Sequence, residues 1–162
     1  KTFFSSFVHA STDRNTRNAL WDNLLIKATD RDEPWFVTGD FNDLISREEK
    51  DGGLERAEGS FSDLRTFFSE GDLFDLQHSG DFLSWRGKRG DNLVRCRLDR
   101  AVSNTHWGEC FPTARCEYLG FESSDHKPLI SIFDQGRRRR RGIFRYDRRL
   151  CKMARQSIIS ES

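Results

Sequence analysis

The sequence predicts an α/β fold built around one hydrophobic core, and three features indicate it. Residues 1–10 are rich in Phe and Val, as a strand is, and residues 14–28 repeat apolar side chains every four positions, as one face of a helix does. Residues 34–39 are nearly all apolar, which is typical of a strand buried on both faces. The 162 residues suffice for one such core but hardly for two.

Two helix starts and one helix end can be located from capping residues. Ser11 or Thr12 is suited to cap the first helix, and Ser60 with Asp63 resembles a capping box before the apolar stripe of a second helix. Gly71 is placed to end that second helix. Both helices are amphipathic, so we expect them to pack on a sheet.

From residue 72 to residue 133 the sequence predicts mainly strands. Residues 72–104 have the pattern of strand, turn and strand, with the polar loop 87–92 as a hairpin. Asn104 is suited to cap a short helical turn, and residues 127–133 form a last apolar strand. No internal repeat is visible.

Composition excludes several classes of protein. The chain lacks an apolar run of about 18 residues, and its first residues lack the pattern of a signal peptide, so neither a membrane partner nor secretion is expected. The four cysteines, at positions 96, 110, 116 and 151, show no zinc-finger spacing and read as reduced thiols. We therefore expect a nuclear or cytoplasmic protein.

Charge divides the chain into two parts. Residues 137–162 carry 10 Lys and Arg against 2 Asp and Glu, whereas residues 1–136 carry 17 against 24. The expected organisation is one domain over residues 1–134 followed by a basic linker or tail over residues 135–162. The arginine run Arg137–Arg141 is suited to bind RNA or DNA or to serve as a nuclear signal, although such runs are more often solvated linkers.

Three short motifs occur in order, each at or beside a predicted strand end. They are G-D-F-N at residues 39–42, R-L-D-R at residues 97–100 and S-D-H at residues 124–126. Taken singly, G-D-F-N is more often a polar turn, and the histidine of S-D-H is more often a structural residue. Consecutive Ser, Asp and His cannot form a Ser-His-Asp triad, because triad members must meet from separate positions.

Together with F-L-S-W-R-G, E-E-K-D-G-G and S-D-H-K-P-L, these motifs resemble the endonuclease/exonuclease/phosphatase superfamily over about residues 1–133. More narrowly, they resemble the C-terminal half of the apurinic-endonuclease-like domain of plant LINE-type (non-LTR) retrotransposons. The resemblance implies a four-layer α/β sandwich of two mainly antiparallel sheets with helices outside, here a truncated half. It also implies nicking of DNA with Mg²⁺, or alternatively Mn²⁺, and a reverse transcriptase domain as partner in the full-length element.

The resemblance implies a role for each matching residue. Asp40 would orient the attacking water and hold the metal, and Asn42 would donate to the phosphate or the water. Asp99 would orient His126, which would stabilise the charge that builds on phosphate. Asp125 would bind the metal or assist protonation of the leaving oxygen.

Three further positions are candidates for substrate binding. Trp85 matches an aromatic that lies against sugar or base, and a core tryptophan is an equal alternative. Arg86 is suited to contact the DNA backbone, although charges at a hairpin usually mark a solvated tip. His9 lies where many relatives have a phosphate-binding Tyr.

The half that would supply an early Asn and a metal-binding Glu is absent from the sequence, and Glu49 and its acidic neighbours lie in the wrong context to replace that Glu. We therefore expect uncovered apolar surface at Phe3, Phe7, Phe36 and Val37, and weak or no activity in the chain alone. A non-catalytic remnant that binds nucleic acid through its tail is the rival hypothesis. A phosphatase for a small phosphoester is a third.

Overall fold

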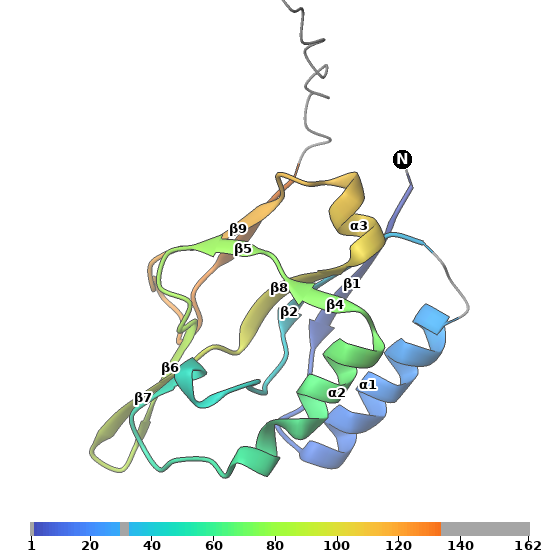
Figure 1. The fold of residues 1–162 in the computed structure, drawn as a ribbon. Coiled ribbons are helices and arrows are strands. Elements are labelled where there is room, and N and C mark those ends of the chain that lie inside the picture. The colour runs from blue at the N-terminus through green and yellow to red at the C-terminus, as the bar shows by residue number, and fades with distance from the viewer. Residues whose placement is uncertain (1, 30–32, 134–162) are drawn as a thin grey trace, which may run out of the picture.

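A four-stranded mixed sheet is the centre of the fold in the computed structural model, which describes residues 2–29 and 33–133 (Figure 1). The strand order is β1-β2-β8-β4, with β1 parallel to β2 and the other two pairs antiparallel. The strands are β1 (Phe4–His9), β2 (Trp35–Asp40), β4 (Leu73–Asp75) and β8 (Asp99–Asn104). The chain has a mixed α/β fold, as the sequence predicts.

Helices α1 (Arg14–Thr29) and α2 (Ser62–Glu70) lie side by side against one face of this sheet (Figure 1). Their apolar stripes meet the inward side chains of the strands, with Trp21 stacked between Phe41 and Phe67. Val37 and Val102 are fully buried in the same cluster. This core fixes β2 in the middle of the fold, so the end of β2 is a rigid position for side chains.

The opposite face of the sheet packs on α3 (Thr105–Cys110) and on a second sheet, β10-β9-β5. Phe36 points to this side because neighbouring residues of a strand face opposite ways, and its ring stacks on Trp107. The strands are β5 (Gln77–Ser79), β9 (Arg115–Tyr118) and β10 (Leu129–Ile132). Asn104 caps α3, since its Oδ1 accepts from the Trp107 N–H at 3.0 Å, as predicted.

A third sheet, β3-β7-β6, carries the predicted hairpin. Its strands are β3 (Lys50–Asp51), β6 (Trp85–Arg89) and β7 (Asn92–Cys96), and the hairpin projects from the body (Figure 1). Two 3₁₀ helices, Arg47–Glu49 and Glu58–Phe61, bracket the glycine-containing loop between β2 and α2. The described residues form three sheets, and the central one is partly parallel.

Both predicted N-terminal caps are wrong. Asp13 caps α1, because its Oδ1 accepts from the backbone N–H of Thr16 at 2.9 Å. At α2 the side chain of Ser60 bonds the Ala57 carbonyl instead, and Asp63 accepts from Arg14 and Asn18 of α1. The predicted end at Gly71 is confirmed, since its N–H donates to the Phe67 carbonyl at 3.0 Å.

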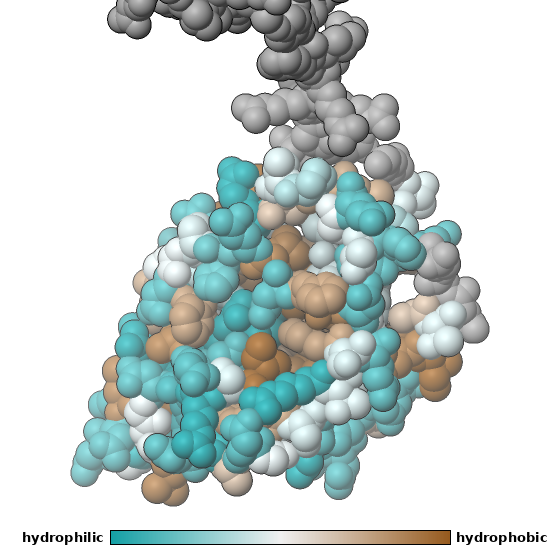
Figure 2. Space-filling model, viewed as in Figure 1, coloured by the Kyte–Doolittle hydropathy of each residue, from teal (hydrophilic) through white to brown (hydrophobic). Residues whose placement is uncertain are grey.

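The expectation of uncovered apolar surface holds at one position of four. Phe36 and Val37 are buried, and Phe3 packs edge-on against Phe111, whereas Phe7 is 84% exposed. On the face in Figure 2 hydrophilic residues dominate, and apolar ones show between them. The second sheet and α3 cover the face that we expected to be open.

Three of the cysteines are free thiols, at positions 96, 110 and 116, as predicted. In the part of the chain that the structure describes, no helix has the length and apolarity needed to cross a bilayer. The predicted basic tail, residues 135–162 with Arg137–Arg141 and Cys151, lies outside the described residues.

Candidate active site

Strand pairing brings three of the predicted site residues into one row. β1 runs parallel to β2 with His9 beside Asp40, and β8 runs antiparallel to β2 with Asp99 opposite Asp40. The close approach of β1 and β2 needs a glycine at position 39, which has φ 137° and where a Cβ would lie 2.0 Å from the Val8 carbonyl oxygen. Asp40, which follows Thr38 and Gly39, is therefore the last residue of the central strand β2.

Asp40 is largely buried and held by Asn42. Its Oδ1 accepts from the Asn42 backbone N–H at 2.9 Å, and its Oδ2 accepts from the Asn42 side-chain amide at 2.8 Å. Burial, with the nearby charge of Asp99, raises the pKa of the Asp40 carboxyl above its ordinary value. Asp40 is thus a better proton acceptor than a free aspartate.

Asn42 adopts a left-handed conformation, φ 47°, that asparagine tolerates better than most residues. Its amide nitrogen donates both to Asp40 and to the Ala10 carbonyl at 2.8 Å, so both amide hydrogens are engaged within the chain. The resemblance implies a donor to phosphate or water. In this geometry Asn42 orients Asp40 instead.

The predicted hydrogen bond between Asp99 and His126 is present, with 2.8 Å between Asp99 Oδ2 and His126 Nδ1. An ionised carboxylate can only accept, so it selects the forms of the ring that carry a proton on Nδ1. Partial burial of the ring opposes its charge. The hydrogen bond and charge of Asp99, with Asp40 and Asp125 adding, outweigh this and raise the pKa of His126 above its ordinary value.

Asp125 is tied to Trp85. The indole N–H of Trp85 donates to Asp125 Oδ2 at 3.0 Å, and this bond is the main cause of the lowered pKa of Asp125. The indole lies across Gly87, where an added Cβ would come within 2.4 Å of the ring. Trp85 is partly exposed: it lines the pocket described next and also packs against the buried cluster that contains Val94 and Cys96.

An open pocket of about 890 Å³ joins most of these groups. Asp40, Asn42, Trp85 and His126 line it, and so do His9, Arg89, residues 10–12 between β1 and α1, and Thr16 and Leu20 of α1. The His9 ring is exposed, and its Nδ1 lies 3.6 Å from Asp40 Oδ2. One carboxylate, that of Asp40, and two histidines therefore line a cavity that a phosphate could enter, whereas Asp99 and Asp125 are not among its lining residues.

Arg86 does not line this pocket. Its guanidinium stacks over the Phe121 ring at 4.3 Å from the centroid, while Arg89 lies over the Trp85 ring at 5.6 Å. Arg89 is thus the hairpin arginine that lines the candidate site. The sequence indicates it, with Arg86 and Lys88 in the same loop, as a candidate contact to the DNA backbone.

The described residues do not by themselves form a metal site. Among residues 2–29 and 33–133, no group of three or more His, Cys, Asp or Glu side chains is arranged to hold an ion. Asp40 and Asp125 offer carboxylate oxygens, but each already accepts hydrogen bonds from the chain. The donor set of this chain therefore fits a Mg²⁺ ion incompletely.

The arginines of R-L-D-R are internal. Arg97 pairs with Glu49 at 3.2 Å and with Asp75 at 2.8 Å, and the fully buried Arg100 pairs with the same two carboxylates. This cluster holds both flanks of Asp99. The sequence analysis rejected Glu49 as a metal ligand and did not identify this role for it. Glu49 and Asp75 are far along the chain from the two arginines that they contact.

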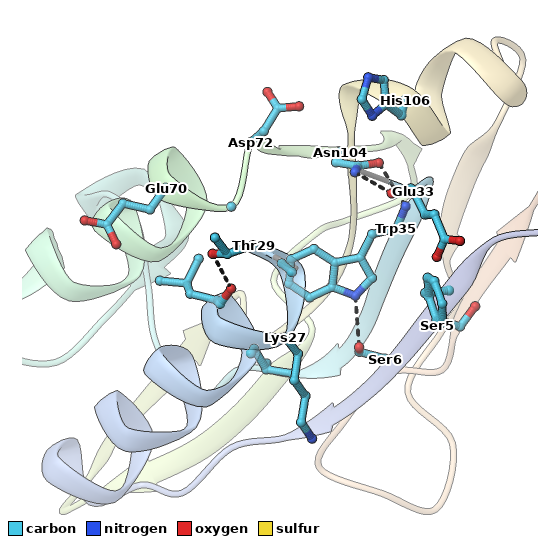
Figure 3. A pocket seen from close by; sticks show the side chains of 15 residues that line it. Ser5, Ser6, Lys27, Thr29, Glu33, Trp35, Glu70, Asp72, Asn104 and His106 are labelled. Atoms are coloured by element: carbon cyan, nitrogen blue, oxygen red, sulfur yellow. Dashed lines mark hydrogen bonds between the residues drawn. The ribbon is translucent and has the colours of Figure 1, made fainter. Parts of the chain in front are cut away.

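A second pocket, of about 330 Å³, lies at the other end of β2 (Figure 3). Trp35 is central in it, and the indole N–H donates to Ser6 Oγ at 2.9 Å. The labelled carboxylates of Glu70 and Asp72 point away from that indole (Figure 3). Its acidic groups do not converge, so this pocket does not resemble a catalytic site.

Comparisons with known proteins bear on the family and the fold. The model of the endonuclease/exonuclease/phosphatase family matches residues 3–126. A search of the curated proteins finds no match.

Among solved structures, the endonuclease domain of TRAS1, a telomere-specific non-LTR retrotransposon, is similar with a TM-score of 0.55 and 16% identity, over 78% of this chain and 54% of that one. The mannosyl-6-phosphatase Bt3783 of Bacteroides thetaiotaomicron has a TM-score of 0.48 and 16% identity, over 82% and 51%. The chain thus spans about half the length of these structures. With a family model that matches most of its residues, the chain belongs to the endonuclease/exonuclease/phosphatase family.

Proposed function

We propose that this chain carries phosphodiester-hydrolysing residues of a DNA-nicking endonuclease of the kind found in non-LTR retrotransposons, within a four-layer sandwich that a further segment completes. The observation that carries the proposal is the hydrogen bond from Asp99 to His126, because His126 lines the same open pocket as the Asp40–Asn42 pair. The likeness to the TRAS1 endonuclease domain supports the fold on which this site is built.

The proposed chemistry follows from the charges of these side chains. With its raised pKa, His126 stays protonated in a larger fraction of molecules near neutral pH, so it places positive charge where phosphate oxygens gain negative charge. Asp40, also with a raised pKa, is placed to take a proton from an attacking water. Asn42 keeps the Asp40 carboxylate in position.

Members of the family generally use divalent metals, and a bound Mg²⁺ or Mn²⁺ would supply charge neutralisation at the phosphate. Asp40 and Asp125 are the carboxylates we assign to it. Mg²⁺ is commonly held by one or two carboxylates together with water and substrate phosphates. The remaining ligands would come from outside the described residues.

The proposed substrate is DNA rather than a small phosphoester. The pocket is open, and the basic hairpin with Arg86, Lys88 and Arg89 lies beside it. A hairpin of this charge is suited to a nucleic-acid backbone. A small phosphoester would leave the charges of these three side chains without a phosphate to bind.

The test is nicking of supercoiled plasmid by this chain fused to the N-terminal half of a family member. We expect His126→Ala and Asp40→Ala each to lower kcat by about 10²–10⁴-fold, the range for loss of an acid–base or charge-stabilising group. His106→Ala, a histidine outside the site pocket, is the matched control. Nicking at the unsubstituted rate by His126→Ala would contradict the proposal.

A further inference from the structure

Ser84 is a buried serine that directly precedes β6. Its side chain is fully buried, and its Oγ accepts from the backbone N–H of Asp99 at 2.9 Å and from that of Leu98 at 3.1 Å. The serine hydroxyl thus supplies the acceptor for two backbone amides at the start of β8. The position of the Asp99 backbone therefore depends on one side chain.

The main chain of Ser84 holds the other member of the pair. Its carbonyl accepts from the Lys127 N–H at 2.7 Å, and the next two residues continue the contact through the Trp85–His126 bridge and the Arg86 N–H bond to the Asp125 carbonyl at 2.9 Å. His126 is thus fixed by the segment that Ser84 begins. One residue bonds both the Asp99 segment and the His126 segment.

The far side of Asp99 is held differently. Its carbonyl accepts from the Tyr118 hydroxyl at 2.9 Å, and that hydroxyl accepts from Arg97 Nε at 3.1 Å. Tyr118 therefore steadies Asp99, and its strand pairs with the chain after His126, with Tyr118 opposite Leu129. Ser84 bonds Asp99 and Lys127 directly, one residue from His126.

We propose that Ser84 is the positioning residue of the Asp99–His126 pair: its hydroxyl and carbonyl set the separation at which the carboxylate reaches Nδ1. The catalytic consequence rests on the function proposed above, whereas the contact itself stands on geometry. Replacing the hydroxymethyl side chain by the methyl group of alanine would leave two amides without an acceptor at a position that is closed to bulk solvent. The segment would then move to satisfy them, and Asp99 would move with it.

The experiment reads the tautomer of the His126 ring by ¹⁵N NMR in the chain itself, above the pKa of the ring. Asp99 selects the tautomer with a proton on Nδ1, so the ratio of the two tautomers reports the hydrogen bond. Asp99→Asn supplies the ratio for a lost carboxylate. In Ser84→Ala we expect the ratio to fall severalfold toward that of Asp99→Asn, and in Ser84→Thr, which keeps the hydroxyl, to stay near the unsubstituted value.

Two further variants separate positioning from general loss of stability. Leu73→Ala removes core volume in β4, away from the pair, and we expect it to lower the melting temperature without changing the tautomer ratio. Ser84→Cys keeps the side-chain volume with a weaker acceptor, so an intermediate ratio is expected even if Ser84→Ala does not fold. An unchanged ratio in Ser84→Ala or Ser84→Cys, or an equal fall in Leu73→Ala, would overturn the proposal. Because the readout needs no DNA cleavage, failure of the proposed function leaves the result interpretable.

Discussion

At the scale of single residues, the candidate site is a set of ionisable side chains that lie in short contact with one another. Asp40 and Asp99 lie opposite each other on neighbouring strands, where like charges repel. His126 lies between carboxylates and gains positive charge, while the pKa of Asp40 rises. The pKa values of Asp40 and His126 therefore both lie above those of isolated side chains, and such shifts are typical of functional sites.

Replacing Asp99 by Asn should lower the pKa of His126, because the main group that raises it loses its charge. The folded-state pKa of His126 lies above the unfolded value, so the stability from this pair is present below the unfolded pKa and is lost as pH rises through the folded pKa. We expect Asp99→Asn to cost about 0.5–1 kcal/mol near pH 5.5 and less near pH 9. NMR titration and urea unfolding at both pH values measure this. A larger cost at the higher pH would contradict the assignment.

At the scale of elements, periodicity predicted β1, α1 and β2 because each buries a regular set of apolar side chains. β9 was not predicted, because its four residues alternate Arg and Glu with Cys and Tyr and are too short to show a pattern. The capping prediction at Ser60 and Asp63 failed for a tertiary reason, since Asp63 is taken by Arg14 of α1. Local rules could not foresee that contact.

The candidate site, like the fold, was predicted only in part from the sequence. The ordered motifs located Asp99 and His126, since each lies at a strand end that the sequence marks. Ser84 and Glu49 could not be found, because their partners are 15 and about 50 positions away and become neighbours only in the fold. The residues to which we assign the chemistry thus lie in recognisable motifs, whereas the residues that position them do not.

The buried charge cluster gives a prediction for the elements it joins. Glu49 links the 3₁₀ helix before β3 to Arg97 and Arg100 at the β7–β8 corner. Breaking a buried pair leaves an uncompensated charge, so Glu49→Gln should lower the free energy of unfolding by about 3 kcal/mol. Glu55→Gln, which removes an exposed partner of Arg47, should change it by less than about 0.5 kcal/mol. Chemical denaturation compares the two, and equal effects would show that the cluster is not stabilising.

At the scale of the whole molecule, the described residues bury most of their apolar side chains. The chain spans 54% of the TRAS1 endonuclease domain that it resembles. Phe7 on the edge strand β1 is 84% exposed, beside the His9 end of the site. An exposed aromatic at the edge of a sheet is suited to pack against a further segment.

We therefore predict that the chain alone folds but does not nick DNA at a measurable rate, although Asp40, Asp99 and His126 are in place. No three-ligand metal cluster exists among the described residues, so a divalent cation would bind weakly and would not be fixed against the phosphate. The assay is nicking of supercoiled plasmid with Mg²⁺, in which the unfused chain is compared with the fused chain and with an unfused Asp40→Ala, His126→Ala double variant. We expect the unfused chain and the double variant to be equally inactive, while circular dichroism shows both folded. Nicking by the unfused chain that the double substitution abolishes would show that these residues suffice, because the same side chains would then be acting without the ligands that we assign to the absent part.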